Sequence, residues 1–167
     1  MQLYFLRHAI AVPRGTPGYP NDDRPLTEEG ILKMRDAAQG ISFLVDGFTT
    51  IFSSPLKRAF QTAEIVAEAL GQKDRIEICD ELLPGSSFES IGMRLKKMKR
   101  NASVLLVGHE PEIGYFASAM LGSEHSVIQF KKGALCRIDT ESFMLHEPGV
   151  LIWHLPPKQL RALRKVK

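Results

Sequence analysis

Short apolar runs that stop at glycine, proline or polar residues recur along the chain, and they predict β-strands. Residues 3–6 form such a run directly before Arg7 and His8, which is typical of a strand buried on both faces. Similar runs predict five further strands, at residues 50–54, 75–79, 103–107, 134–139 and 150–155. A hairpin around residues 147–149 would join the last two of these strands.

Apolar residues at intervals of three and four lie between these strands and predict four helices. The first begins after Thr27, whose side chain suits an N-cap, and its apolar residues recur as far as Leu44. The other three helices are predicted at residues 56–70, 88–98 and 111–121. Residues 11–25 are rich in Pro and Gly and predict a loop. Because strands alternate with helices, the expected fold is α/β: a three-layer αβα sandwich around an open, mostly parallel sheet with an antiparallel edge.

Length and composition indicate an ordinary globular protein. The 167 residues are 44% hydrophobic and 25% charged, and we expect a single domain over residues 1–167. Cys79 and Cys136 each lie in an apolar run, and we interpret both as buried free thiols. The first residues lack the pattern of a signal peptide, and no apolar run approaches the roughly 20 residues of a membrane helix. We therefore expect a cytoplasmic protein that does not bind membranes.

The formal net charge of +3 makes the chain mildly basic. The excess cations lie in two clusters, one at Lys96, Lys97, Lys99 and Arg100 and one at Arg161, Arg164, Lys165 and Lys167. We interpret both clusters as solvated surfaces or chain ends and expect no nucleic-acid binding, because no recognition motif or interleaved aromatic residues accompany them. A mildly positive field does favour an anionic substrate.

Candidate catalytic residues follow three of the predicted strands. Arg7 and His8 follow the first strand, and His109 follows the fourth. Arg58 comes shortly after the second strand. Ligands of open α/β sheets bind just beyond the carboxyl ends of the strands, so these side chains should meet at one edge. The remaining histidines, which we interpret as structural or surface residues, are His125, His146 and His154.

Two arginines and two histidines at one edge point to phosphoryl chemistry. The planar guanidinium matches phosphate oxygens and stays charged at any ordinary pH. A neutral histidine beside such a clamp can attack phosphorus and carry it covalently. The second histidine, if protonated, would stabilise the equatorial oxygens.

Four segments resemble the motifs of one enzyme family. They are residues 6–9 (LRHA), 24–30 (RPLTEEG), 53–63 (SSPLKRAFQTA) and 107–111 (VGHEP). In this order they are similar to the motifs of the histidine phosphatase superfamily. The short chain and the Gly-His-Glu-Pro sequence most resemble the SixA-type phosphohistidine phosphatases. The resemblance implies a phosphoglycerate mutase-like fold.

The resemblance also implies a role for each residue. His8 would be the nucleophile, followed here by Ala9 where the family commonly has glycine. The residues that hold the phosphoryl group would be Arg7, Arg58 and His109. Glu81 is the best positional match to the family's proton donor, although SixA-type proteins fit this part of the pattern poorly. The alternative donors in the first loop are Asp22 and Asp23.

The expected activity is that of a phosphatase that needs neither a metal nor another cofactor, because arginine and histidine supply the positive charge. The segment between Arg58 and His109 is too short for a large lid, which favours an open pocket and a phosphorylated protein of the histidine-containing phosphotransfer type as partner. A phosphatase of small esters such as sugar phosphates is the alternative, and a mutase would want a covered site. A silent phosphoprotein-binding module would not need the nucleophile. We expect a monomer.

Overall fold

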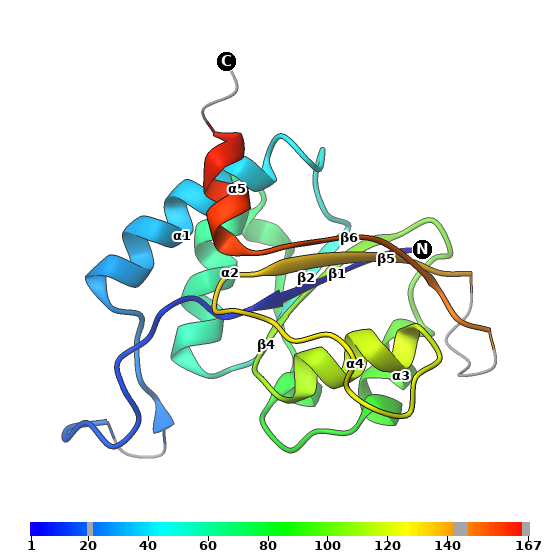
Figure 1. Cartoon of the computed structure of the whole chain (residues 1–167), viewed down its shortest axis with the longest axis horizontal. Coiled ribbons are helices and arrows are strands. Elements are labelled where there is room, and N and C mark those ends of the chain that lie inside the picture. Colours follow the sequence, from blue (N-terminus) through cyan, green and yellow to red (C-terminus); the bar gives the residue numbers. More distant parts are fainter. Residues whose placement is uncertain (20–21, 142–146, 165–167) are drawn as a thin grey trace.

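The structure, a computed structural model, describes residues 1–19, 22–141 and 147–164, and the strands within these ranges form one mixed sheet (Figure 1). The strands are β1 (Gln2–Arg7), β2 (Thr50–Ser53), β3 (Ile76–Ile78), β4 (Ser103–Gly108), β5 (Leu135–Asp139) and β6 (Val150–Leu155). Their order across the sheet is β3-β2-β4-β1-β5-β6. The first four pair in parallel, whereas β5 is antiparallel to both β1 and β6. The predicted mostly parallel sheet with an antiparallel edge is confirmed.

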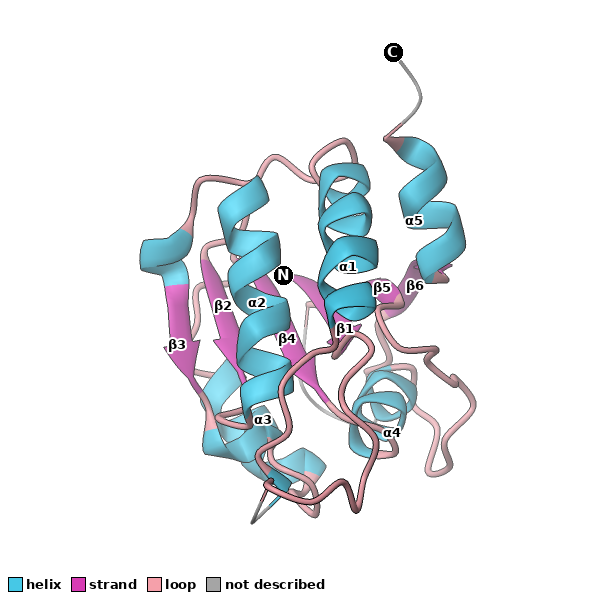
Figure 2. Cartoon of the chain, turned by 90° about the vertical axis from the view of Figure 1, so that its left-hand side faces the viewer, coloured by secondary structure: helices cyan, strands magenta, loops and turns pink. Residues whose placement is uncertain are grey.

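Helices cover both faces of this sheet (Figure 2). One face carries α1 (Glu28–Ile41), α2 (Lys57–Ala69) and α5 (Pro157–Leu163), and the other carries α3 (Phe88–Leu95) and α4 (Glu112–Met120). The predicted three-layer α/β fold is therefore confirmed. Among the described residues, no helix is both long enough and apolar enough to cross a membrane.

Strand β1 shows why the apolar runs are continuous rather than alternating. Tyr4 and Leu6 belong to the core under α1, α2 and α5, whereas Leu3 and Phe5 belong to the core over α3 and α4. Successive side chains of a strand point to opposite faces, and both faces of this sheet are covered, so every position from Leu3 to Leu6 is apolar. Cys136 and Cys79 lie buried as free thiols in the second of these cores, as predicted.

Several boundaries differ from the predicted ones. Helix α1 begins after its N-cap Thr27, as predicted, but it ends at Ile41 rather than near Leu44. Helix α3 ends at Leu95, three residues before the predicted end. Strands β5 and β6 do pair as neighbours, and residues 142–146 between them, with His146, lie outside the described residues.

Helix α5 is a correction, because the sequence reading treated this cationic stretch as a solvated end. Pro157 occupies its first turn, a favoured position for proline, and Leu160 is fully buried against α1. Arg161 is partly buried, and Arg164 forms an ion pair with Asp36 of α1. The apolar signal was weak because one buried leucine anchors a helix of seven residues. Lys165 and Lys167 lie outside the described residues.

A glycine permits the close contact between α1 and α5. A Cβ atom added to Gly40 would lie 1.8 Å from the carbonyl oxygen of Leu160, far inside van der Waals contact. The backbone of α5 therefore rests directly on that of α1 at this point. Any side chain at position 40 must push the two helices apart.

We expect Gly40→Ala to lower the free energy of unfolding by about 1–3 kcal/mol, because the cost of overpacking exceeds the gain of about 1 kcal/mol in helix propensity. Urea denaturation measures this change. Gly92→Ala is the matched control, since Gly92 also lies in a helix but a Cβ there would meet no atom within 4 Å. The control should be neutral or stabilising; a similar loss in both variants would contradict the contact.

Candidate active site

The sheet register brings the candidate residues together at its carboxyl edge. Arg7, the last residue of β1, pairs with Gly108, the last residue of β4, so His8 and His109 leave neighbouring strands side by side. Their imidazole rings lie 5.1 Å apart between centroids. Arg58 is the second residue of α2, the helix that follows β2. Its positive charge is close enough to lower the pKa of both histidines. The prediction that the two histidines and two arginines lie together at one edge of the sheet is confirmed.

The tautomer of His8 follows from its backbone contact. Its Nδ1 lies 2.7 Å from the carbonyl oxygen of Ala9, which can only accept, so Nδ1 must carry a proton. In the neutral ring, Nε2 then holds a free lone pair. Burial lowers the pKa of His8 to about 3, and the positive charges of Arg58 and Arg7 act in the same direction. His8 is therefore a neutral base with a free Nε2 at physiological pH.

His109 is buried beside His8 and held from the opposite side. Its Nε2 lies 2.9 Å from the hydroxyl oxygen of Ser54, which also accepts from the backbone N–H of Leu56. The Ser54 proton can therefore point at Nε2, which leaves the proton of the neutral ring on Nδ1. Burial lowers the pKa of His109 to about 3, with Arg58 as the next cause. A bound phosphate would oppose both effects and raise this pKa.

Arg58 is almost fully buried and contacts the first loop. Its Nη1 donates to the carbonyl oxygen of Asp22 at 2.8 Å, and its Nη2 forms an ion pair with the Asp22 carboxylate at 3.0 Å. Arg24 binds the same carboxylate at 2.6 Å, and Arg14 lies 3.7 Å from it. Three guanidinium groups thus surround one carboxylate, so the cluster keeps a net positive charge.

Arg7 is held by a backbone carbonyl on the other side of the site. Its Nη1 donates to the carbonyl oxygen of Phe130 at 2.6 Å, and the N–H of Phe130 donates to Glu110 at 2.6 Å. Burial raises the pKa of this carboxyl group. Gly114 lets the segment approach, because a Cβ there would lie 2.6 Å from the carbonyl oxygen of Ile128. The Phe130 peptide therefore links Glu110 to Arg7.

Thr62 connects the residues that follow β1 to helix α2. Its hydroxyl accepts from the N–H of Ala9 at 3.0 Å and donates to the carbonyl oxygen of Arg58 at 2.7 Å. Sequence reasoning assigned no role to Thr62, although it lies within the motif of residues 53–63. It equally missed Ser54 and Glu110, which lie within the motif segments, and the Phe130 carbonyl, for which the sequence gave no signal.

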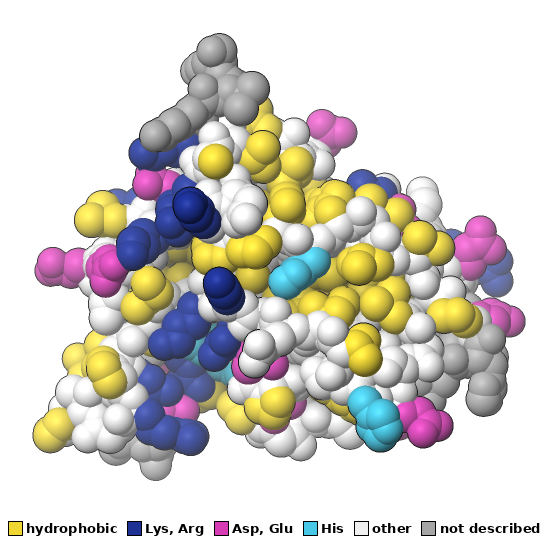
Figure 3. Space-filling view, viewed as in Figure 1, with side chains coloured by type: hydrophobic (Ala, Val, Ile, Leu, Met, Phe, Trp, Pro, Cys, Tyr) yellow, Lys and Arg dark blue, Asp and Glu magenta, His cyan; other side chains and the backbone are white. Residues whose placement is uncertain are grey.

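Unpartnered nitrogen atoms converge on the same place. Among the described residues, Nε of Arg7, Nε of Arg58 and Nδ1 of His109 are buried and have no hydrogen-bond partner. Buried polar atoms are nearly always satisfied in folded proteins, so donors left open at one edge indicate a site for an acceptor-rich anion. Figure 3 shows Lys and Arg side chains gathered around a partly covered histidine on this face. The geometry and the charge both suit a phosphoryl group.

The candidate proton donors occupy different positions. Glu81 accepts from the thiol of Cys79 at 3.2 Å and lies 3.9 Å from Arg94, and the hydrogen bond from its own backbone N–H is the main cause of its lowered pKa. The hydrogen bond from Arg24 lowers the pKa of Asp22, the carboxylate that contacts Arg58. Asp23 accepts from the first N–H of α2, at Lys57, and is exposed. None of these contacts favours a protonated carboxyl.

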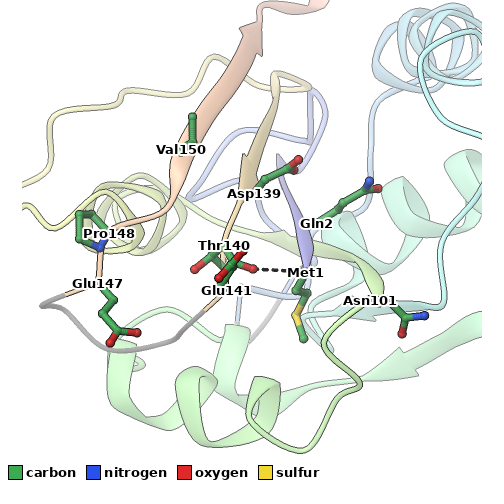
Figure 4. Close-up of a pocket in the computed structure, with 9 residues that line it drawn as sticks. All are labelled: Met1, Gln2, Asn101, Asp139, Thr140, Glu141, Glu147, Pro148 and Val150. Atoms are coloured by element: carbon green, nitrogen blue, oxygen red, sulfur yellow. Dashed lines mark hydrogen bonds between the residues drawn. The ribbon is translucent and has the colours of Figure 1, made fainter.

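Another hollow lies away from these residues, at the amino end of β1 (Figure 4). Its volume is about 730 Å³. It is lined by Met1, Gln2, Asn101, Asp139, Thr140, Glu141, Glu147, Pro148 and Val150. Its three carboxylates would repel a phosphate. His125 is exposed and His154 packs its ring against Phe130, so neither histidine joins the site, as the sequence predicted.

Comparisons with known proteins agree with this geometry. A model of the histidine phosphatase superfamily, branch 1, matches residues 3–83. An uncharacterized protein of Picosynechococcus sp. (strain PCC 7002) is 35% identical over 172 residues, which cover 93% of this chain and 100% of the relative. The phosphohistidine phosphatase SixA of Escherichia coli (strain K12) is 24% identical over 168 residues, covering 99% of this chain and 100% of SixA. A solved structure of the protein histidine phosphatase SixA complexed with tungstate is 27% identical, with a TM-score of 0.82 over 96% of this chain and 99% of that one.

The depressed pKa of His8, about 3, links stability to pH. The folded chain keeps this ring neutral, whereas the unfolded chain takes up a proton below its ordinary pKa of about 6.5, so stability falls as the pH drops from about 6.5 towards 3. Between pH 7 and pH 5 the wild type should lose about 2 kcal/mol more than His8→Asn, measured by urea denaturation. The matched control is His125→Asn, which leaves the His8 ring in place. Parallel losses in wild type and His8→Asn would show that the buried ring titrates normally.

Proposed function

Because this chain belongs to the histidine phosphatase superfamily, we propose that it is a metal-independent phosphatase that works through a phosphohistidine on His8 and acts on phosphohistidine in a protein. The family, and the likeness to SixA over nearly the whole chain, support phosphatase activity. The roles of single residues and the nature of the substrate are the parts that we add.

The hydrogen bond from His8 Nδ1 to the Ala9 carbonyl carries the mechanistic proposal. It fixes the ring with its unprotonated Nε2 available, and burial keeps that nitrogen unprotonated. A histidine that must attack phosphorus needs this combination of tautomer and low pKa. A residue used only to bind phosphate would be more effective in its charged form.

Arg7, Arg58 and His109 supply the charge that the transferred phosphoryl group requires. Both guanidinium groups are fixed by contacts other than the ligand, so little reorganisation is needed when charge develops on the oxygens. His109 would take up a proton as the anion binds, because the anion raises its pKa. These positive groups make a metal ion unnecessary for charge neutralisation.

The reaction would proceed in two displacements on phosphorus. His8 Nε2 attacks, the bond between phosphorus and the substrate nitrogen breaks, and its electron pair stays on the departing imidazole. Water then attacks the phosphoenzyme, the bond between phosphorus and Nε2 breaks, and the electron pair returns to His8. The proton lost by water ends on inorganic phosphate or in solvent.

The state of the candidate acids supports phosphohistidine as the substrate. Glu81 and Asp22 both have lowered pKa values, so only a small fraction of either carboxyl carries a proton to give at neutral pH. An alkoxide must be protonated as it leaves, whereas an imidazole that carries a proton on its second nitrogen leaves as a neutral molecule. A site whose candidate acids are mostly ionised therefore suits a phosphoramidate bond better than a phosphate ester.

Trapping the phosphoenzyme tests the nucleophile. A reaction with labelled phosphohistidine peptide, quenched during turnover, should leave an acid-labile and base-stable label on the wild type and none on His8→Ala. The label should form equally with EDTA present, because arginine and histidine provide the charge. Label on serine, cysteine or aspartate of an active enzyme would refute the mechanism, and absence of turnover would favour a binding module.

The proton donor is tested with two substrates. Glu81→Gln should change turnover of a phosphohistidine peptide by less than about 3-fold and slow an alkyl phosphate by about 10²-fold or more, the usual worth of general acid catalysis. Glu77→Gln is the matched control, because Glu77 contacts the same Arg94, at 3.5 Å.

Equal losses on both substrates would mean that Glu81 acts through folding or binding. Loss on neither substrate would exclude Glu81 and leave Asp22, Asp23 or no acid. Efficient hydrolysis of a sugar phosphate by an enzyme that ignores phosphohistidine would overturn the substrate half of the proposal. The experiment thus tests the substrate and the proton donor independently of the proposed role of His8.

A further inference from the structure

A narrow groove begins one residue beyond the nucleophile. Its floor is formed by Ala9, Ile10, Gly30, Met34, Ala37, Gly133 and Pro157, and its rim by Lys33, Lys132 and Arg161. Three separate parts of the chain, α1, the segment before β5, and α5, contribute a cation each. The groove therefore combines an apolar floor with a positively charged rim.

The groove is continuous with the backbone of the catalytic site. The N–H of Gly133 donates to the carbonyl oxygens of Arg7 and His8, at 3.0 and 3.2 Å. Ala9 carries the carbonyl that orients the His8 ring. A ligand in the groove would thus touch the main chain that holds the nucleophile. The groove is placed to receive whatever is covalently attached to the phosphoryl group.

The three rim cations differ in their ion pairing. Lys33 forms an ion pair with Glu29, one turn earlier on α1. Within the ranges that the structure describes, Lys132 and Arg161 have no ion-pair partner. Figure 3 shows the Lys and Arg side chains as a band that continues from the partly covered histidine towards α5. The unpaired charge lies on the path leading away from the site.

The size of the groove distinguishes between possible occupants. Its volume is about 170 Å³, well below the roughly 300–1,000 Å³ of sites that enclose a small-molecule ligand. It has room for one or two side chains of an extended segment, with their methylene groups on the apolar floor and their carboxylates at the rim. Charge and size together select an acidic peptide segment.

We propose that this groove docks an acidic segment next to the phosphorylated histidine of the protein substrate, with Lys132 and Arg161 as its specificity-determining residues. The inference rests on the proposed function, since it concerns the protein attached to the phosphoryl group. Exposed cations at the rim of an interface act mainly on encounter and partner choice, and salt screens them. The groove should therefore change recognition while the chemistry at His8 stays as it is.

Two short peptides with a central phosphohistidine test the groove, one flanked by Asp and Glu and the other by Asn and Gln. Wild-type enzyme at about 50 mM salt should show a kcat/KM about 10-fold higher for the acidic peptide, mainly through KM, and about 300 mM salt should shrink the difference. Lys132→Glu combined with Arg161→Glu should remove or reverse the preference. Free phosphohistidine, which cannot reach the rim, should be hydrolysed equally by all variants.

The matched control is Lys96→Glu combined with Lys99→Glu, which changes net charge equally on exposed residues between α3 and β4, at the opposite end of the sheet. It should keep the wild-type preference. Lys132→Ala with Arg161→Ala gives the same test if charge reversal disturbs folding, and thermal unfolding checks each variant.

Equal kcat/KM for the two peptides, or a preference that survives in the Lys132 and Arg161 variants, would overturn the groove proposal alone. The phosphatase proposal would stand in that case, because both peptides are hydrolysed. Failure of the wild type to hydrolyse either peptide or free phosphohistidine would overturn the proposed function, and the groove proposal with it.

Discussion

The parallel ladder between β1 and β4 fixes the spacing of the two histidines. Arg7 stands opposite Gly108, and the N–H of His8 donates to the Gly108 carbonyl at 3.0 Å. From the other side, the N–H of Gly133 holds the carbonyls of Arg7 and His8. A slip of one residue would send every side chain of β1 to the opposite face and take His8 away from His109. The tautomer of His8, the pKa values of both histidines and the positive charge around them all depend on this register.

Burial gives the site its reactivity and also makes it costly for stability. Two neutral histidines and Arg58 are buried at one edge beside the partly buried Arg7, and Asp22 and the Phe130 carbonyl compensate only part of the positive charge. Burying charges without full compensation costs free energy, and functional sites are where folded proteins accept such costs. The phosphoryl group would supply the missing negative charge. The same arrangement that lowers the pKa of His8 therefore also favours binding of an anion beside it.

The sequence predicted where the strands end and which site residues follow them. It did not predict the hydrogen bonds that hold those side chains in place. Runs of apolar residues are local, and the rule that sites lie beyond carboxyl strand ends placed His8 and His109 together without any coordinates. The supporting contacts join residues far apart in the chain: Arg58 and Asp22 are 36 positions apart, Ala9 and Thr62 are 53, and Arg7 and Phe130 are 123. All three use a backbone atom of one partner, which any residue type would supply, so no pattern in the sequence could mark them.

Helix α5 was missed for a related reason. Its one fully buried side chain, Leu160, is outnumbered by cations, and its position depends on the absence of a side chain at Gly40, far away in the sequence. Stability of so short a helix comes from packing rather than from propensity, and packing cannot be read from a local window. The consequence reaches function, because α5 brings Arg161 to the groove. Because the cationic stretch was interpreted as a solvated chain end, the sequence analysis did not place Arg161 beside α1 at the groove.

The floor and the rim of the groove are under different constraints. Ala9 and Gly133 line the groove, but they also make backbone hydrogen bonds that position His8, and Gly133 adopts a positive φ of 79° that disfavours other residues. A change in the floor would therefore disturb the position of His8. Lys132 and Arg161 act on the site only electrostatically, and solvent and salt screen this interaction. The buried ring of His8 is largely protected from such screening. Recognition can consequently change at the rim without altering the chemistry, which is what a fold needs if one phosphoryl-transfer centre is to serve different partner proteins.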